Sequence, residues 1–349
     1  MSITIGSLFS GIGGLELGVA AALGGEVVWQ VEQDPFCQSV LRKQFPDSIL
    51  IDDVHDAGSA SLPSPDVICG GFPCQDLSVA SSTHTGLDGD RSGLFFEMVR
   101  VVKELEPKTV VIENVPRLLS KYRDVVEAEM NQLGYGVCWV KCAASDVGAP
   151  HLRRRVFLVC QRNARNELIN LTHAIKKKLW PTPTANPFGD NSSVRRWLQR
   201  RERMMRNGQR PISPPLAIMA VMVEAGIPWP PKGRRWHTPS ATDWKGSSRN
   251  GQRRFQLTDD FHGGDKGRLN PDWVTHLMGL PAGWLDGEVG RVAWPAPRPD
   301  LATARNKQHE WEPPRLLKKS YRGRAQRLKA LGNAVVPQQA AFAIKVALS

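Results

Sequence analysis

The stretch "ITIGSLFSGIGGLELGVAAAL" (residues 3–23) determines the fold class expected for this chain. Residues 3–9 form a short apolar run that predicts a buried strand, and residues 14–23 have the pattern of a helix. The glycines between them let backbone amides at the helix N-terminus approach a nucleotide-like ligand. Because the spacing is G-x-G-G and not G-x-G-x-x-G, the turn alone fits a tight structural turn as well as a cofactor site.

The same alternation of short apolar runs and helix-like stretches continues to about residue 162. Further strands are expected at 26–32, 48–53, 65–71, 109–115 and 156–161. Further helices are expected at 34–45, 93–105 and 123–134. Asp34 and Pro35 are start signals for the first of these helices. Strands that alternate with helices predict an α/β fold with a parallel, doubly wound sheet.

Length and composition favour a protein with a substantial core that does not enter a membrane. The chain has 349 residues and contains no run of apolar residues long enough to span a bilayer. Its N-terminus lacks the basic and apolar segments of a secretory signal. The six cysteines match neither a disulfide framework nor a zinc spacing, so we expect no metal site and a reducing, cytoplasmic setting.

Charge is distributed unevenly along the chain. Residues 1–150 carry 10 Lys and Arg against 20 Asp and Glu, a net charge of −10. Residues 151–349 carry 36 against 14, a net charge of +22. A generally basic, soluble surface explains so lopsided a division poorly. The distribution indicates chemistry in the front half and binding of a polyanion, above all a nucleic acid, in the back half.

The sequence after residue 162 changes character and predicts a second domain. Pro, Gly, Arg and Trp dominate this region, and nine of the eleven Trp lie after residue 150, which favours packing over disorder. Residues 327–348 are again apolar and periodic and predict a helix that returns to the first domain. We therefore expect a first domain of residues 1–162 plus 326–349 and a smaller, loop-rich, basic domain of residues 163–325.

Acidic residues end two of the expected strands. Glu32 ends the second strand, where a carboxylate can bind both hydroxyls of a ribose. Asp53 ends the third strand and could accept a hydrogen bond from an adenine amino group. Together with the glycine turn, these strand ends fit an adenosyl ligand whose ribose carries no 2′-phosphate.

The segment "GGFPCQDLS" (70–78) places Cys74 directly after the fourth strand. A core cysteine would more often lie inside the strand, and a metal ligand would need partners at a suitable spacing. At the carboxyl edge of such a sheet, a thiol is a candidate nucleophile, although a pKa of about 8.5 leaves little thiolate at neutral pH. Glu113 ends the next strand at this edge, and Arg153 and Arg155 open another strand, where an arginine cluster is more often a solvated surface.

Five short motifs occur in an order that resembles the DNA (cytosine-5) methyltransferase family. They are "FSGIGG" (9–14), "PCQ" (73–75), "ENV" (113–115), "RRR" (153–155) and "GNAVVP" (332–337). The resemblance covers residues 3–162 and 268–345. It implies a Rossmann-like methyltransferase sheet for the first domain and target recognition by the second. The implied reaction is methyl transfer from S-adenosyl-L-methionine to carbon 5 of a cytosine in a specific duplex DNA sequence.

The resemblance also implies the roles of the catalytic residues. Cys74 would attack carbon 6 of cytosine, and Glu113 would hydrogen-bond the ring nitrogen N3. Arg153 and Arg155 would be the Arg-x-Arg pair, with Arg155 reaching the cytosine carbonyl. This chemistry is covalent catalysis, because a thiolate adduct at C6 makes C5 enamine-like. The reacting base must leave the stacked duplex before it can be attacked.

Further contacts follow from the same resemblance. S-adenosyl-L-methionine would lie on Phe9, Gly11, Gly13, Glu32, Asp53, Pro73, Leu94 and Asn333. Residues 268–286 resemble the motif that supports the recognition domain. Residues 180–193 and 236–248 echo each other in their Trp and Thr-Pro pairs, as a weak repeat or by coincidence of composition. The candidate DNA contacts are Ser78, Arg200, Arg201, Arg203, Thr238 and Lys245.

Two positions depart from the family pattern. His151 stands where the family usually has Gln, which bears on the hydrogen bonds behind the Arg-x-Arg pair. Residues 80–86 read "ASSTHTG" where the family often has Gly and basic residues, so loop closure and phosphate contacts are open questions.

The sequence leaves other functions open. A tRNA cytosine-5 methyltransferase shares the architecture, although the long basic segment favours duplex DNA. A catalytically inactive DNA-binding relative is a further alternative, against which the intact Cys74, Glu113 and Arg155 argue. We expect a monomer that binds double-stranded DNA in the cytoplasm of a bacterium or a phage-infected host. A cognate restriction endonuclease, an orphan role and a phage protection role all stay open, as does the target sequence.

Overall fold

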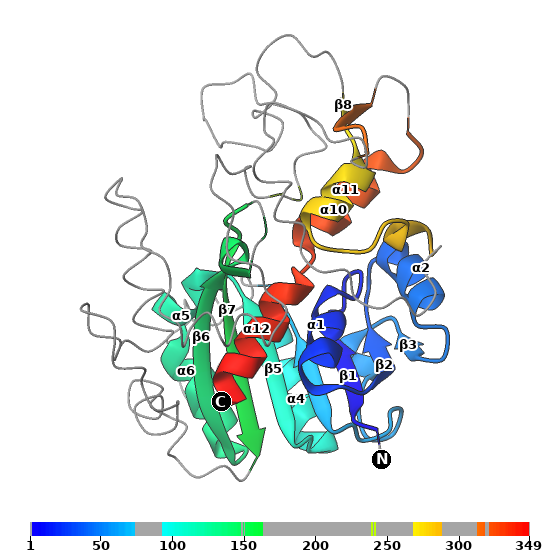
Figure 1. The fold of residues 1–349 in the computed structure, drawn as a ribbon. Helices are drawn as coiled ribbons and strands as arrows, with labels where there is room; N and C mark the ends of the chain where they lie inside the picture. Colours follow the sequence, from blue (N-terminus) through cyan, green and yellow to red (C-terminus); the bar gives the residue numbers. More distant parts are fainter. Residues whose placement is uncertain are drawn as a thin grey trace, which may run out of the picture.

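The computed structural model describes residues 2–73, 93–147, 149, 151–162, 239, 241, 268–287, 313–317 and 321–348. Within these residues, seven strands form one sheet in the order β3-β2-β1-β4-β5-β7-β6 (Figure 1). The strands are β1 (Thr4–Leu8), β2 (Glu26–Val31), β3 (Ile49–Ile51), β4 (Val67–Gly70), β5 (Thr109–Asn114), β6 (Tyr135–Ala143) and β7 (Arg154–Arg162). A short separate ladder pairs β8 (Arg268–Leu269) with β9 (Leu316–Leu317). The six strands that the sequence predicts are confirmed to within two residues at each end.

The sheet is mixed, which corrects the fully parallel arrangement expected from the sequence. β1 to β5 pair in parallel, but β7 runs antiparallel to both β5 and β6. The link from β6 to β7 is only ten residues long, 144–153, and includes the 3-10 turn η2 (Ala144–Val147). A parallel neighbour needs a crossover of a dozen or more residues, usually a helix, so this link is too short for one. β6 was not expected.

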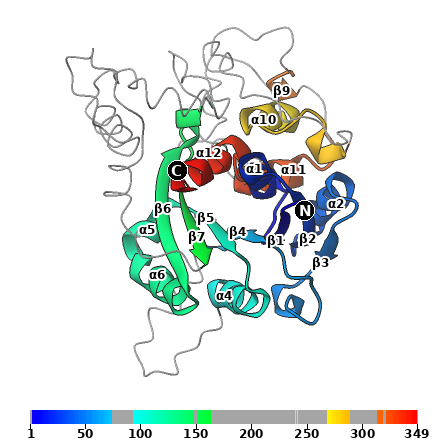
Figure 2. The same cartoon turned by 60° about the horizontal axis from the view of Figure 1, so that its bottom comes forward.

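Helices cover both faces of the sheet, as Figure 2 shows. They are α1 (Gly14–Leu23), α2 (Pro35–Gln44), α4 (Leu94–Leu105), α5 (Pro116–Lys121), α6 (Arg123–Gln132), α10 (Pro271–Leu277), α11 (Arg324–Asn333) and α12 (Pro337–Leu348). α1 and α12 lie on one face, and α4, α5 and α6 lie on the other. Each helix in the described parts of the chain is too short or too polar to cross a bilayer.

The start of α2 follows the sequence signals. Asp34 accepts hydrogen bonds from the backbone N–H groups of Phe36 and Cys37, at 2.9 and 3.3 Å. Pro35 occupies the first turn, where its missing N–H costs no hydrogen bond. This cap fixes the backbone directly after β2, and so it also fixes the neighbourhood of Glu32.

The C-terminal segment forms two helices where the sequence predicted one. α11 ends at Asn333, Ala334 has extended backbone, and α12 begins at Pro337. Pro337 explains the break, because proline lacks the N–H of a continuous helix and disfavours helical backbone in the preceding residue. The break leaves Asn333 at a helix end, and α12 then packs along α1 (Figure 1).

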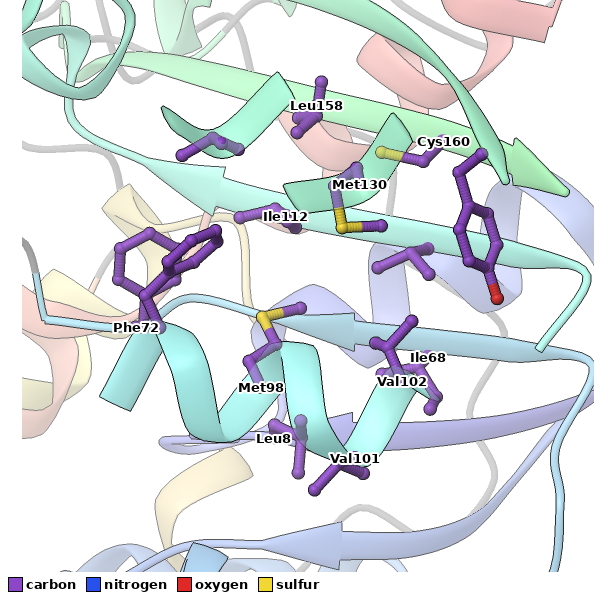
Figure 3. Close-up of a cluster of buried hydrophobic side chains, with 14 of the residues drawn as sticks. Leu8, Ile68, Phe72, Met98, Val101, Val102, Ile112, Met130, Leu158 and Cys160 are labelled. Atoms are coloured by element: carbon purple, nitrogen blue, oxygen red, sulfur yellow. The ribbon is translucent and has the colours of Figure 1, made fainter. Parts of the chain in front are cut away.

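The sheet buries side chains on both faces, as expected for strands covered by helices on each side. Figure 3 shows the cluster in which Ile68 of β4 and Ile112 of β5 pack with Met98 of α4. The alternate residue Val111 points to the opposite face and packs in the cluster that contains Phe342 of α12. This alternation with a period of two fixes which residues reach the edge that carries the site.

A third apolar cluster joins residues 268–287 to the first domain. Trp273 and Trp284 pack there with Ile12 and with Leu331 of α11. Trp284 Nε1 also donates a hydrogen bond to the Ile12 carbonyl oxygen at 2.8 Å. The described part of this region therefore lies against the glycine turn, while the proposed division of the chain into two domains stays a prediction.

Glu16 is a fully buried carboxyl group in α1. It accepts a hydrogen bond from Gln30 Nε2 at 3.2 Å. Burial raises the pKa of Glu16, and hydrogen bonds from its own backbone, Ser7, Gln30 and Ser10 oppose that rise without cancelling it. Because the folded-state pKa exceeds the unfolded value, the group favours folding below the unfolded pKa and loses that contribution as the pH rises through the folded one.

We expect Glu16→Gln to raise Tm at about pH 8 by a degree or more, since roughly 1 kcal/mol corresponds to about 2–4 °C in a domain of 150–250 residues and to less in a larger chain. The amide stays neutral at every pH and can still accept from Gln30. The gain should shrink toward pH 4, where wild-type Glu16 is protonated. Thermal melts across this range, with the exposed Glu26→Gln as control, check the effect. A variant that is less stable at every pH would show that folding requires the ionised carboxylate.

Candidate active site

The carboxyl ends of the parallel strands bring the expected site residues to one edge of the sheet. Phe9 follows β1, Glu32 follows β2, and Asp53 lies two residues beyond β3. Glu113 lies at the end of β5 itself. Because the order β3-β2-β1-β4-β5 makes these strands neighbours, their ends form a continuous row. Doubly wound sheets bind their ligands at this edge.

Glu32 ties the glycine turn to the end of β2. Its Oε2 accepts a hydrogen bond from the Gly11 N–H at 2.7 Å, and its Oε1 accepts one from the Asp34 N–H at 2.8 Å. Burial raises the pKa of Glu32, and these backbone hydrogen bonds act against that rise. Gly11 and Gly13 have φ values of 58° and 85°, which favour glycine. A side chain on Gly11 would have no described atom within 4 Å, so the turn borders open space.

Phe9 and Asp53 follow β1 and β3, the two strands that lie on either side of β2. Phe9 has a φ of 57°, which is strained for a residue with a side chain and persists only where the surroundings impose it. Asp53 Oδ1 lies 2.6 Å from His55 Nδ1, and both side chains are exposed. The hydrogen bonds from His55 lower the pKa of Asp53. Asp53 is therefore an accessible carboxylate beside the end of β3.

The other expected cofactor contacts come from three different elements. Pro73 is exposed beyond β4, and Leu94 is the first, half-buried residue of α4. Asn333 is exposed at the end of α11, although both of its chain neighbours are buried. The cofactor role of all these residues stays a prediction.

The backbone that leads into Cys74 is held against β5. Asn114 Nδ2 donates a hydrogen bond to the Phe72 carbonyl oxygen at 2.9 Å. A Cβ on Gly71 would lie only 3.1 Å from Glu113 Oε2, so this glycine leaves room for the carboxylate. Glu113 and the approach to Cys74 are therefore neighbours. Sequence analysis missed the role of Asn114, since the motif gives its position but not the carbonyl that it holds.

Glu113 and Arg155 form an ion pair at the same edge. Arg155 Nε lies 2.7 Å from Glu113 Oε1, and the side chains are 17 % and 11 % exposed. Glu113 faces Phe157 across the β5–β7 ladder, so Arg155, two residues before Phe157, is its diagonal neighbour on one face. The N–H is not aligned with Oε1, so this contact is an ion pair and not a directed hydrogen bond. Arg155 also donates to the Arg154 carbonyl oxygen.

The pair offers complementary groups to a flat heterocycle. A carboxyl group can bond a ring nitrogen or an amino group, and a guanidinium can donate to a ring carbonyl. Both groups are largely buried, where such hydrogen bonds are stronger than in water. The arrangement can therefore bind and polarise a base placed beside the segment that leads into Cys74.

Arg153 does not join this pair. Arg153 is 2 % exposed, and its guanidinium donates to the backbone carbonyl oxygens of Gly332, Ala334 and Pro239. Burial lowers the pKa of Arg153, Arg155 lowers it further, and Glu113 raises it. The guanidinium still remains charged near neutral pH, because arginine starts from so high a pKa. Its implied catalytic role stays a prediction, whereas its observed partners are backbone groups.

His151, the departure from the family pattern, bonds to α10. Its Nε2 lies 2.8 Å from the Leu277 carbonyl oxygen, so Nε2 carries the proton and donates. Burial, followed by the charge of Arg153, lowers the pKa of His151 to about 3, so the ring is neutral. Its buried Nδ1 has no hydrogen-bond partner among the described residues. The histidine thus links the start of the Arg-x-Arg motif to residues 268–287.

Several candidates lie outside the described residues. They are Cys74, Ser78, Arg200, Arg201, Arg203, Thr238 and Lys245. The roles of these residues stay predictions from the sequence. The five other cysteines are buried thiols, and burial raises the pKa of Cys37, Cys69, Cys142 and Cys160, which makes these four thiols poor nucleophiles.

Comparison with known sequences identifies relatives of this chain. The family model of the C-5 cytosine-specific DNA methylase matches residues 3–210. The type II methyltransferase M.HhaI of Haemophilus parahaemolyticus is 34% identical over 166 residues, which are 46% of this chain and 49% of that protein. The type II methyltransferase M.CviJI of Paramecium bursaria Chlorella virus IL3A is 36% identical over 164 residues, 46% of this chain and 44% of that protein. The chain spans about half the length of the curated relatives that it matches.

Solved structures of methyltransferases align with nearly the whole chain. The Entamoeba histolytica methyltransferase EhMeth aligns with a TM-score of 0.54 and 12% identity, covering 100% of this chain and 98% of that one. The S. pombe Dnmt2 methyltransferase aligns with a TM-score of 0.54 and 12% identity, covering 99% and 98%. These likenesses confirm the Rossmann-like α/β fold. Since the family match includes both the glycine turn and the strands that carry the Glu113–Arg155 pair, the chain belongs to the C-5 cytosine-specific DNA methylase family.

Proposed function

We propose that this protein methylates carbon 5 of a flipped-out cytosine in duplex DNA, through a covalent adduct between Cys74 and carbon 6. The observation that carries the proposal is the Glu113–Arg155 ion pair at 2.7 Å. It lies beside the Gly71–Phe72 backbone that leads into Cys74. Family membership supplies the reaction class, and this geometry supplies groups suited to a pyrimidine ring.

The strand ends suit S-adenosylmethionine as the cofactor. The open space at Gly11 admits a ligand close to the backbone. Glu32, which accepts a hydrogen bond from the Gly11 N–H, can also accept hydrogen bonds from ribose hydroxyls. Asp53 is an exposed carboxylate that can accept from an adenine amino group. Phe9, Gly13, Pro73, Leu94 and Asn333 would complete the contacts.

The chain's own residues would carry the covalent steps. The Cys74 thiolate adds to C6, which forms an S–C6 bond and moves electron density to C5. Glu113 stabilises the charge that develops at N3, and Arg155 binds the ring carbonyl. When bound, S-adenosylmethionine would supply the electrophilic methyl group that C5 takes, and its sulfonium S–CH3 bond would break to leave S-adenosylhomocysteine. A base then removes the C5 proton, and the S–C6 bond breaks to restore the thiolate. Splitting one hard step into easier ones is the gain from covalent catalysis.

The basic back half supports duplex DNA as the substrate. Residues 151–349 carry a net charge of +22, which suits contact with phosphates. A cytosine inside a duplex is out of reach, so the base must be flipped into the site. Ser78 and the basic segment would contact the backbone, and loops of that segment would read base edges in the groove.

A labelled-methyl assay tests the proposal directly. The protein is incubated with S-adenosylmethionine carrying a labelled methyl group and with either duplex DNA or tRNA. We expect label in DNA as 5-methylcytosine and none in tRNA. Label in tRNA alone would identify an RNA methyltransferase, and DNA binding without label in either would identify an inactive relative.

DNA affinity should depend steeply on salt. Each neutralised phosphate contributes roughly −0.9 to the slope of log K against log salt for duplex DNA. Replacing Arg200, Arg201 and Arg203 by glutamine should flatten this slope and leave the methylated motif unchanged. Titrations of DNA binding at several salt concentrations measure the slope. S-adenosylmethionine binding, measured in parallel as the control, should change little with salt.

Residues that read bases should behave in the opposite way. Substitution of Thr238 or Lys245 should relax or shift the methylated motif while leaving the salt slope nearly intact. Sequencing of 5-methylcytosine in DNA treated with each variant gives the motif. If the arginine variants redirect the motif instead, the two roles have been assigned backwards.

A further inference from the structure

Arg153 donates hydrogen bonds to the backbone on both sides of Asn333. Its Nη1 and Nη2 each donate to the Gly332 carbonyl oxygen at 3.0 Å, and Nη2 also donates to the Ala334 carbonyl oxygen. A further hydrogen bond, at 3.2 Å, joins Nη1 to the Pro239 carbonyl oxygen. These contacts use a charged donor group that is 2 % exposed, where hydrogen bonds are strong and costly to lose.

Asn333 is the one exposed residue in a buried stretch. Gly332, Ala334 and Val335 are buried around it. A Cβ on Gly14 would collide with the Val335 carbonyl oxygen, so this stretch lies directly against the first residue of α1. Asn333 therefore lies two residues from a backbone contact with Gly14, the last glycine of the turn that borders the proposed cofactor site.

Arg153 is itself held from a second side. Gln339 Nε2 donates to the Arg153 carbonyl oxygen and to the Cys142 carbonyl oxygen, both at 2.9 Å. Arg153 has a φ of 23°, which is strained for a residue with a side chain. Such strain persists where surrounding contacts over-determine the backbone, and it concentrates at functional sites. The start of β7 and the junction of α11 and α12 thus fix each other.

The two arginines of the motif contact different groups. Arg155 contacts the carboxylate of Glu113, whereas Arg153 donates to the backbone carbonyl oxygens of Gly332, Ala334 and Pro239. The first arrangement faces the reacting base, and the second faces the segment that carries Asn333.

We propose that Arg153 is a positioning residue for the cofactor, which acts by holding Asn333 against the glycine turn. The inference rests on the proposed function, because it takes S-adenosylmethionine as the ligand at that turn. It assigns cofactor affinity to one arginine of the motif and the cytosine contact to the other. Loss of Arg153 should therefore weaken cofactor binding, while chemistry at saturating cofactor largely survives.

The first test is Arg153→Met, which keeps a long side chain and removes its donors. Calorimetry with S-adenosylmethionine, well below Tm, should show a Kd raised by roughly tenfold or more, as expected for lost hydrogen bonds to a charged group. KM for S-adenosylmethionine should rise in parallel, and kcat should stay within a few-fold. Arg162→Met is the matched control, because Arg162 lies at the far end of β7 and pairs with Glu106.

A second variant covers the case in which Arg153→Met does not fold. Arg153→Lys keeps the charge and some donors, so it should give a Kd between those of wild type and Arg153→Met. Combining Arg153→Lys with Asn333→Ala then asks whether Arg153 acts through Asn333. We expect the lysine variant to have little further effect on Kd when Asn333 is already alanine, which is strong coupling in a double-mutant cycle.

Three results would overturn the inference. One is an unchanged Kd and KM with a greatly reduced kcat, which would place Arg153 on the cytosine. Another is a lower Tm with unchanged Kd and kcat, which would mean that Arg153 stabilises the fold and does not affect cofactor binding. The third is full additivity of Arg153→Lys and Asn333→Ala. If the wild-type protein binds no S-adenosylmethionine at all, the proposed function fails, and this outcome is distinct from the other three.

Discussion

A Cys74→Ser variant should transfer no measurable methyl group to DNA while binding DNA as well as the wild type does. The serine hydroxyl is a far weaker nucleophile than a thiolate at neutral pH, so the adduct at C6 does not form. The fold should be unaffected, because the substitution replaces a single sulfur atom by the smaller oxygen and leaves the rest of the side chain unchanged. Methyl incorporation and DNA binding, measured on the same preparations, separate loss of chemistry from loss of structure.

The matched control for this variant is Cys160→Ala. Cys160 is buried in β7 and faces Val110 across the ladder, away from the carboxyl edge. It should retain activity once a modest loss of stability is allowed for. A duplex with 5-fluorocytosine at the target should trap wild-type protein covalently and leave Cys74→Ser free. Near-normal turnover by Cys74→Ser would rule out the covalent mechanism.

Glu32→Ala should raise the Kd for S-adenosylmethionine by roughly 10- to 100-fold, as expected when hydrogen bonds to a charged group are lost. The ribose hydroxyls lose their acceptor. The glycine turn also loses its anchor, because Glu32 accepts from the Gly11 N–H and the Asp34 N–H. Calorimetry on the isolated protein measures the Kd, and Glu26→Ala at the exposed start of β2 is the control.

Glu32→Gln separates the two contributions of the carboxylate. The amide can still accept one of the two backbone hydrogen bonds, but its nitrogen cannot accept the other. Its Kd should therefore fall between those of the wild type and Glu32→Ala. An affinity unchanged in both variants would mean that the cofactor does not use the end of β2.

Much of the fold could be predicted because its signals are local. The apolar run and glycine turn of residues 3–23 give β1 and α1, and the Asp34–Pro35 pair gives the start of α2. The predicted parallel direction of β7 was wrong, because the direction depends on the length of the link from β6. β6 itself was missed, although its residues are mostly buried. The break before α12 was also missed, although Pro337 marks it.

The site was predictable in outline for the same reason. Strand ends are local features, so sequence analysis could select Glu32 and Glu113. The partners of Arg153 and His151 were out of reach, because Gly332 and Leu277 lie 179 and 126 residues away along the chain. The family resemblance assigns the cytosine carbonyl to Arg155, but nothing in the motif shows that Arg153 is buried against backbone carbonyl groups. That distinction comes from the tertiary packing of α10, α11 and α12.

The most direct test of the central claim is expression of the gene in bacteria that lack DNA methylation, followed by genome-wide mapping of 5-methylcytosine. Cells that express Cys74→Ser at the same level are the control. We predict 5-methylcytosine at one recurring sequence motif with the wild type and none with the variant. An unmethylated genome in cells that contain folded wild-type protein, or equal methylation in both strains, would contradict the account.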